Sequence, residues 1–257
     1  MSTALVTGAS AGIGRAFAER LAHDGHDLVL VARDRARLER LVGELRERHG
    51  TAAEVLVADL ADREQTEEVC RRLADPDRPV DVLVNNAGFG LHRPFLDNDV
   101  VQEEAALDVM VRAVMLTCHA AGRAMRERGR GTIVNVGSVA GFMANGTYAA
   151  EKSFVTVFSE ALAGQLRGTG VGVTAVCPGL TRSEFHTRAR MSLPGVPRAL
   201  WTEAAEVAQQ GLADAAAGKV VSVPGAQWKV ASLVVRALPR PLVRGGAARL
   251  VEALRRR

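Results

Sequence analysis

Short apolar runs alternate along the chain with longer stretches in which apolar residues recur at helical spacing. The runs are rich in Val, Leu and Ala, which is typical of strands covered on both faces. They are TALVTG, DLVLVA, AEVLVADL, VDVLVNNAG, GTIVNVGS, VGVTAVCPG and KVVSVPG. The stretches between them predict helices near residues 13–25, 35–50, 62–74, 98–128, 147–167 and 203–217. Strict alternation implies right-handed crossovers and a parallel sheet.

Residues 181–201 lack such a pattern. They contain two prolines and a glycine, and we expect a mobile loop there. By length alone, 257 residues fit one large domain or two small ones. No stretch approaches the roughly 20 apolar residues of a membrane span, and the N-terminal residues do not have the pattern of a signal peptide. The three cysteines are far apart and suit neither a metal site nor a disulfide framework, so a cytoplasmic protein is expected.

Positive charge is concentrated near the C-terminal end. The formal net charge is +4, but residues 229–257 contain eight Lys or Arg and one acid, Glu252, and so carry +7. Residues 1–228 are left with −3. Because the basic character belongs to a tail and not to a domain, we expect no nucleic-acid partner.

The first predicted strand runs directly into a glycine-rich turn, TGASAGIG, that opens a helix. Gly8, Gly12 and Gly14 allow a tight turn in which backbone N–H groups approach a pyrophosphate at the helix N-terminus. A tight turn without a ligand is the alternative.

The end of the second predicted strand is expected to meet the adenosine ribose. An acid there would bind the 2′-hydroxyl of NAD, whereas an arginine accommodates the 2′-phosphate of NADP. Here Ala32 stands where the acid would be, and Arg33 and Arg35 follow. Asp34 lies between the arginines, and its side chain could cap the next helix. This favours NADP(H) over NAD(H), the alternative being that both arginines are solvated charges.

Five motifs occur in order: TGASAGIG (7–14), ADL (58–60), NNAG (85–88), Ser138 followed by YAAEK (148–152), and CPG (177–179). With these motifs the chain resembles the short-chain dehydrogenase/reductase family over about residues 1–225. The resemblance implies a Rossmann-type three-layer αβα sandwich with a seven-stranded parallel sheet as the catalytic domain, residues 1–225. From their own pattern, residues 226–257 are expected to form a basic amphipathic extension packed on that domain. The resemblance also implies a nicotinamide cofactor, reversible carbonyl/alcohol chemistry and a homo-oligomer.

The resemblance further implies which residues contact the cofactor. It places Asp59 at the adenine, residues 86–88 beside the cofactor, and residues 178–179 near the nicotinamide. The expected cofactor-binding residues are Gly8, Ser10, Gly12, Ile13, Gly14, Arg33, Asp59, Leu60, Asn86, Ala87, Gly88, Tyr148, Lys152, Pro178, Gly179 and Thr181.

Tyr148 is the only tyrosine in the chain, and Lys152 follows it by four positions. Hydride addition to a carbonyl requires a proton donor, and Tyr148 could supply the proton. Positions i and i+4 share a helix face, so we expect Lys152 to lower the pKa of Tyr148 and to reach the cofactor ribose. Ser138 could hydrogen-bond the carbonyl oxygen. Taken singly, Tyr148 could be a half-buried aromatic residue, Lys152 a solvated charge on a helix, and Ser138 a cap at a strand end.

Two features depart from the family pattern. The segment between Ser138 and Tyr148 is a few residues short, so their geometry depends on a tight turn, with Asn145-Gly146 as the candidate. Many relatives carry an asparagine where Met110 stands, and it holds a water for proton relay. Either Met110 fills the core and the proton relay uses a different route, or proton exchange with solvent is impaired.

The loop after the sixth strand is expected to bind substrate. Its residues and their neighbours are mostly apolar, which favours a medium-sized hydrophobic ketone, aldehyde or alcohol. The candidates are Phe142, Met143, Phe185, His186, Met191, Leu193 and Trp201.

The basic tail, residues 229–257, has two interpretations. It is either a helical cover over the substrate pocket or a subunit contact, which we favour, or an amphipathic segment on an anionic membrane surface. Two alternatives to an oxidoreductase therefore stay open: a cofactor-binding regulatory protein, and a membrane-peripheral protein with weak catalysis.

Overall fold

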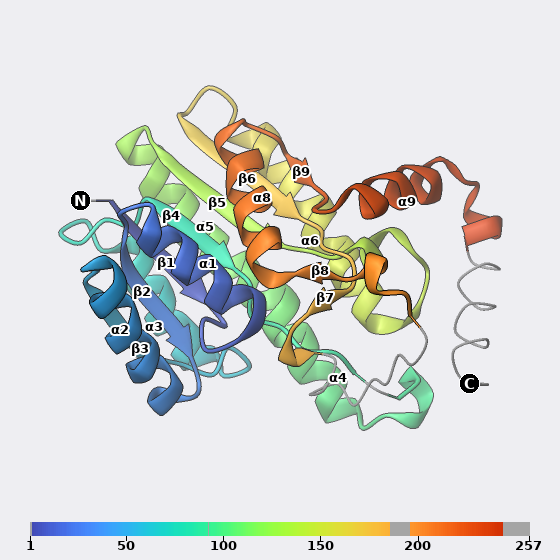
Figure 1. The fold of residues 1–257 in the computed structure, drawn as a ribbon, viewed down its shortest axis with the longest axis horizontal. Helices are drawn as coiled ribbons and strands as arrows, with labels where there is room; N and C mark the ends of the chain where they lie inside the picture. The colour runs from blue at the N-terminus through green and yellow to red at the C-terminus, as the bar shows by residue number, and fades with distance from the viewer. Residues whose placement is uncertain (1, 92, 186–195, 244–257) are drawn as a thin grey trace.

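A seven-stranded parallel sheet forms the centre of the computed structural model, which describes residues 2–91, 93–185 and 196–243 (Figure 1). The strand order is β3-β2-β1-β4-β5-β6-β9, and every pairing is parallel. The predicted sheet is therefore confirmed. The strands are β1 (Thr3–Thr7), β2 (Asp27–Ala32), β3 (Ala53–Val57), β4 (Val82–Asn85), β5 (Gly131–Val136), β6 (Val171–Val176) and β9 (Val221–Ser222).

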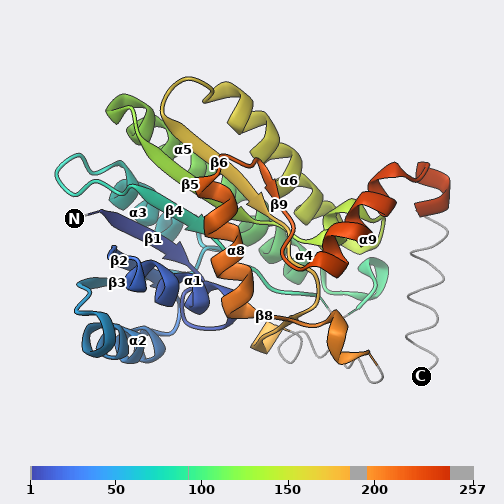
Figure 2. The same cartoon turned by 45° about the horizontal axis from the view of Figure 1, so that its top comes forward.

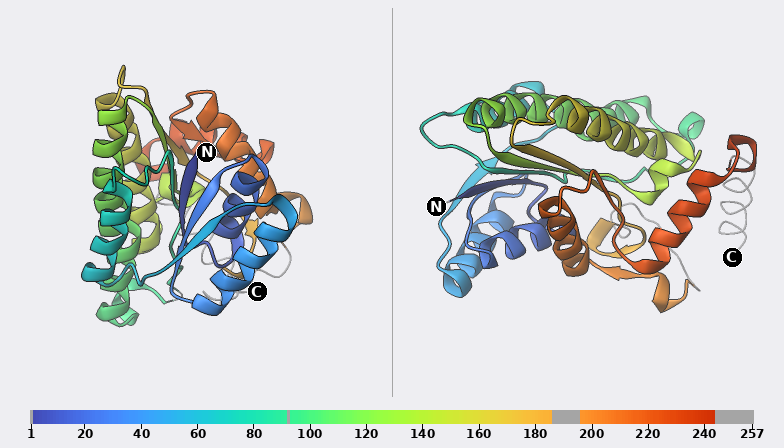
Figure 3. Two further views of the ribbon diagram at one scale, coloured as in Figure 1. Left: turned by 90° about the vertical axis from the view of Figure 1, so that its left-hand side faces the viewer. Right: turned by 90° about the horizontal axis from the view of Figure 1, so that it is seen from above.

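Helices cover both faces of this sheet and give the predicted three layers (Figure 3). One face packs against α1 (Gly12–His23), α2 (Arg35–His49) and α8 (Ala204–Ala216), through a core that includes Phe17, Leu38 and Val207. The opposite face packs against α3 (Arg63–Ala74), α4 (Val100–Leu107), the π-helical segment η2 (Asp108–Arg112), α5 (Ala113–Arg128) and α6 (Gly146–Gln165).

The helical stretch Val100–Arg128 is long and apolar enough to cross a membrane, contrary to the expectation from sequence. Half of its most apolar 18 residues is buried inside the fold, and Met110, Ala113 and Met125 belong to the core beside the sheet. The apolar character of this stretch therefore follows from its place in the core.

A buried polar ladder fixes β4 and β5 to the helices behind them. Asn85 Nδ2 donates to Asn135 Oδ1 at 3.0 Å across the two strands, and Thr117 Oγ1 of α5 donates to Asn85 Oδ1 at 2.9 Å. Asn135 Nδ2 in turn donates to Ser159 Oγ of α6 at 2.9 Å. Because an unpaired amide in the core is costly, this ladder holds α6 in one register against β5.

Several elements lie beyond the predicted pattern. Two short strands, β7 (Thr181–Arg182) and β8 (Thr202–Glu203), pair in parallel, and the last helix, α9 (Ala226–Ala237), lies beyond the carboxyl edge of the main sheet (Figure 2). Single-turn helices are η1 (Phe95–Asp97), η3 (Val139–Phe142) and η4 (Arg198–Leu200). Of the expected mobile loop, residues 186–195 lie outside the described residues, as do residues 244–257 of the basic tail.

Candidate active site

The glycine-rich turn lies between β1 and α1, where the strand order reverses from β1 to β4. Gly8 and Gly12 adopt the left-handed region, with φ of 65° and 56°. A Cβ on Gly8 would lie 2.8 Å from Asn86 Nδ2, and one on Gly14 would overlap the Gly8 carbonyl. Residue 11 at the start of α1 is an alanine, and no side chain among the described residues caps the first turn. The turn thus presents bare backbone close to the surface, which is the shape and polarity that a pyrophosphate requires.

The end of β2 carries the predicted ribose-side residues. Arg33 is 73% exposed, and its Nη1 lies 3.6 Å from Asp59 Oδ2. Asp34 accepts a hydrogen bond from Arg37 N at 3.0 Å and caps α2, as the sequence suggested. Asp59 accepts from Ala61 N at 3.0 Å. A cationic side chain therefore stands at the strand end with its head group in solvent.

Asn86 anchors the turn from the neighbouring strand end. Its Nδ2 donates to the Thr7 carbonyl at 3.0 Å, and its backbone N–H donates to Thr7 Oγ1 at 2.9 Å. Thr181 Oγ1 donates to the Gly179 carbonyl at 3.1 Å, and Pro178 accepts from Val139 N at 3.0 Å. These contacts bring the predicted cofactor residues to one edge of the sheet. Of the remaining ones, Ser10, Leu60, Ala87 and Gly88 lie on the same strand ends and turns, and Ile13 lies in the first turn of α1.

Ser138, Tyr148 and Lys152 meet at the carboxyl end of β5. The Ser138 hydroxyl lies close enough to Tyr148 to lower the pKa of the phenol, and it also caps η3 by accepting from Ala140 N at 3.1 Å. The short connection is closed by η3 and by Gly146, which has a φ of 71° at the start of α6. Lys152 Nζ lies 5.9 Å from the centre of the Tyr148 ring and donates to the Val136 carbonyl at 2.8 Å.

The electrostatics differ from the expectation that Lys152 lowers the pKa of Tyr148. Burial raises the pKa of Tyr148 to about 12, and the Ser138 hydroxyl opposes this shift. Burial also lowers the pKa of Lys152 to about 8, which the Glu151 carboxylate counters. Desolvation therefore exceeds the pairwise attraction that the i, i+4 spacing predicted.

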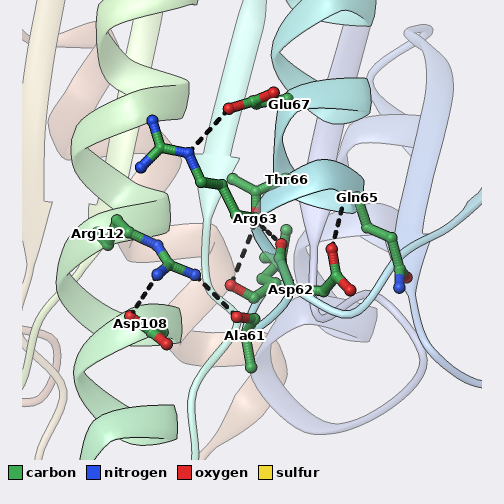
Figure 4. Close-up of polar contacts among 9 residues, drawn as sticks. Ala61, Asp62, Arg63, Gln65, Thr66, Glu67, Asp108 and Arg112 are labelled. Carbon is green, nitrogen blue, oxygen red and sulfur yellow. Dashed lines mark hydrogen bonds and ion pairs between the residues drawn. The ribbon is translucent and has the colours of Figure 1, made fainter.

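Met110 is fully buried in η2 and lies against the site. A Cβ on Gly88 would lie 3.1 Å from Met110 Sδ and 3.6 Å from Lys152 Nζ. Arg112 fixes η2 from the outside, because its Nη2 donates to the Ala61 carbonyl at 2.8 Å and its Nη1 pairs with Asp108 at 2.7 Å (Figure 4). Met110 is thus a core residue that fills the space between Gly88 and Lys152.

Two buried carboxyls beside the site were not found from the sequence. Glu103 of α4 accepts from Thr147 Oγ1 at 2.6 Å and from Asn98 Nδ2 at 2.8 Å. Glu151 of α6 is 5% exposed, and among the described residues its Oε2 has no hydrogen-bond partner. Burial and the nearby Glu103 raise the pKa of Glu151 to about 7, whereas Lys152 lowers it. The signal in the sequence was a glutamate on the Tyr148 side of α6.

One aromatic ring contacts the tyrosine, and others lie along the same edge of the sheet. The Phe185 ring lies 5.7 Å from the Tyr148 ring, and Phe142 packs in a small cluster with Trp228. Trp228, which sequence reasoning missed, donates from Nε1 to the Leu200 carbonyl at 3.1 Å and covers Gly179 so closely that a Cβ there would overlap its indole. Met143 follows η3, and the Trp201 ring lies 6.0 Å from the Arg182 guanidinium. Three candidates fall outside the described residues: His186, Met191 and Leu193.

The segment 183–185 bridges the two ends of the site. Ser183 Cβ lies 3.1 Å from where a Cβ on Gly12 would be, and Glu184 pairs with Arg37 at 2.9 Å. Phe185 then reaches the Tyr148 ring. One short piece of chain therefore contacts the glycine-rich turn, the start of α2 and the Tyr148 ring.

Comparison with known proteins agrees with this geometry. A family model described as short chain dehydrogenase matches residues 2–193. The chain is 38% identical over 186 residues to sulfoacetaldehyde reductase 2 of Chromohalobacter salexigens. This match covers 70% of this chain and 73% of the other protein. Among solved structures it is similar to a short-chain dehydrogenase from Sphingobium yanoikuyae in complex with NADPH, with a TM-score of 0.83, 35% identity, and coverage of 91% and 93%. The chain is also similar to the bulky-bulky ketone specific alcohol dehydrogenase of Comamonas testosteroni, with a TM-score of 0.79 and 32% identity. That match covers 91% of this chain and 92% of the other.

Proposed function

Since this chain belongs to the short-chain dehydrogenase family and is an oxidoreductase of alcohols and carbonyls, we propose that it uses NADP(H) on a medium-sized hydrophobic substrate, with Tyr148 as the general acid/base. The observation that carries this proposal is the convergence of Ser138, Tyr148 and Lys152 at the edge of the sheet that also holds the glycine-rich turn. We also propose a cytoplasmic location, supported by three free cysteines, and a homo-oligomer.

The described residues fit a dinucleotide. Gly8, Gly12 and Gly14 leave room for a pyrophosphate at the start of α1, where no side chain in the described part of the chain caps the N–H groups. The exposed Arg33 supports a 2′-phosphate at the end of β2, and the similar Sphingobium yanoikuyae protein was solved with NADPH. When bound, this group supplies the hydride to the carbonyl carbon or takes it up.

Proton delivery falls to the three polar side chains. With a pKa of about 12, Tyr148 is neutral at physiological pH and can donate its phenolic proton to the carbonyl oxygen as negative charge develops there. The Ser138 hydroxyl is positioned to hold both the tyrosine and that oxygen. Lys152, fixed by the Val136 carbonyl, stabilises the phenolate that remains until a proton returns from solvent.

The surroundings of Tyr148 support an apolar substrate. Phe185 contacts its ring, so the group attached to the carbonyl would meet aromatic surface there. The similar Comamonas testosteroni enzyme is specific for bulky-bulky ketones, which is consistent with this reading.

The test is a fluorescence titration with NADPH and NADH, followed by turnover on a panel of hydrophobic ketones and aldehydes. We expect tighter binding of NADPH, and turnover that Tyr148→Phe reduces by at least about a hundredfold while NADPH binding is kept. Phe185→Leu serves as a control that alters the neighbouring ring but leaves the phenol. Cofactor binding without turnover, unchanged in Tyr148→Phe, would favour a cofactor-binding regulatory protein.

A further inference from the structure

The outer face of α9 is apolar and exposed. Val230, Leu233 and Val234 are 63%, 65% and 53% exposed and lie on one side of the helix, at i, i+3 and i+4. Trp228 and Ser232 occupy the opposite side, which packs toward the domain. The apolar face continues past the helix end with the exposed Leu238 and Leu242. A row of exposed aliphatic side chains indicates a surface that binds another protein or a membrane.

Basic residues accompany this face. Lys229, Arg236 and Arg240 lie on or just after α9, and all three are exposed. Arg236 is partly engaged, since its guanidinium lies 5.4 Å from the Phe142 ring and 4.0 Å from Glu160. By sequence, residues 244–257 add five arginines and one glutamate. The helix with its exposed aliphatic row thus belongs to a segment of net charge +7 on a domain of −3.

We propose that the outer face of α9 binds reversibly to the surface of a membrane that contains anionic lipids. A helix with aliphatic residues on one side and Lys and Arg beside them lies in the headgroup region, with the apolar side toward the acyl chains and the basic groups at the phosphates. The inner face stays on the domain through Trp228, whose Nε1 donates to the Leu200 carbonyl. The helix therefore needs no rearrangement to present its outer side.

Charge disfavours the other occupants of this face. A second copy of the chain would bring one +7 segment against another, with Glu252 as the only acid in each. A nucleic acid would match the charge but not the aliphatic row, because protein–DNA interfaces are strongly polar. An anionic lipid surface satisfies both the charge and the apolar side chains. This inference does not depend on the proposed reaction.

The test is co-sedimentation of the full-length protein with vesicles of phosphatidylcholine, alone or mixed with phosphatidylglycerol. We expect binding only to the mixed vesicles, and a loss of binding when salt rises from about 0.1 M to about 1 M, which shortens the Debye length from about 10 Å to about 3 Å. The variant Val230→Ser/Leu233→Ser/Val234→Ser should bind at least about tenfold more weakly. Because these side chains are exposed, its melting temperature and its NADPH affinity should match those of the wild type.

A matched control removes exposed apolar residues from α4, α5 and α6. The variant Leu107→Ser/Met115→Ser/Val157→Ser changes three side chains that are similarly exposed but lie on the helices of the opposite layer. Its vesicle binding should be unchanged. Wild-type binding by the α9 variant, no binding of the wild type to the mixed vesicles, or loss of binding only in the control would each overturn the proposal. A lower oligomer mass for the α9 variant in analytical ultracentrifugation would assign this face to a second copy instead.

Discussion

Replacing Glu151 with glutamine should remove a pH dependence from the stability of this protein. The pKa of the buried carboxyl is raised from its ordinary value of 4.5 to about 7. Below pH 4.5 it is protonated in both folded and unfolded chains. As the pH rises from 4.5 to 7 the unfolded chain ionises first, so the folded state loses stability, and above pH 7 the loss is complete. At about 1.4 kcal/mol for each tenfold change in proton affinity, this loss is about 3 kcal/mol.

The assay is urea unfolding of wild type and Glu151→Gln at several pH values between 5 and 7.5. Lys152 stays mostly charged in this range, because its pKa is about 8 in the folded state and 10.5 in the unfolded chain. Loss of the Glu151 carboxylate lowers the pKa of Lys152 further, which affects the variant only at the upper end of the range. The free energy of unfolding of the wild type should fall relative to the variant as the pH rises. Glu104→Gln, which removes an exposed carboxylate from α4, should follow the wild type.

The reasoning would be refuted if wild type and Glu151→Gln gave parallel stability curves from pH 5 to 7.5. A second readout checks the link to the site. The Glu151 carboxylate raises the pKa of Tyr148, so the variant should shift the alkaline limb of the pH–rate profile to lower pH. A merely structural role would lower activity without moving that limb.

Three further substitutions test the cofactor side and the core. Arg33→Ala should weaken NADPH binding about tenfold and leave NADH binding nearly unchanged, because only the former loses a charged contact to phosphate; equal effects in a fluorescence titration would contradict the assignment. Gly14→Ala should abolish binding of both nucleotides, since its Cβ would overlap the Gly8 carbonyl, whereas Gly43→Ala, with open space around it, should bind normally. Met110→Asn buries an amide beside Lys152, and the melting temperature should fall by several degrees. Unchanged turnover in Met110→Asn would indicate that the proton relay runs by a route that does not use residue 110.

The strand pattern predicted the sheet because strands covered on both faces must be apolar at every position. Each of the seven predicted runs contains a strand, and the glycine turn and the Ser138, Tyr148 and Lys152 set lie at their carboxyl ends. The order of the motifs was sufficient to predict that these residues lie together, because the residues that follow parallel strands lie at the same edge of the sheet.

Contacts between segments that lie far apart in the sequence and have little hydrophobic pattern could not be predicted. Trp228 lies 49 positions after Gly179, and nothing local predicts that the indole covers that glycine. The strands β7 and β8 have two residues each, too few for any periodicity. Helical spacing brought Lys152 beside Tyr148, but the pKa of the phenol depends on how much protein surrounds it, which spacing does not encode.

The contacts of segment 183–185 have a kinetic consequence. This segment touches the glycine turn, Arg37 and the Tyr148 ring, so a nucleotide and a substrate bound as proposed would both contact it. On the proposed binding mode, the nucleotide contacts this segment before the substrate packs against it, and the segment has to release the nucleotide after the reaction. Steady-state turnover should therefore be ordered, with nucleotide first on and last off, and the overall rate should be set by departure of the nucleotide.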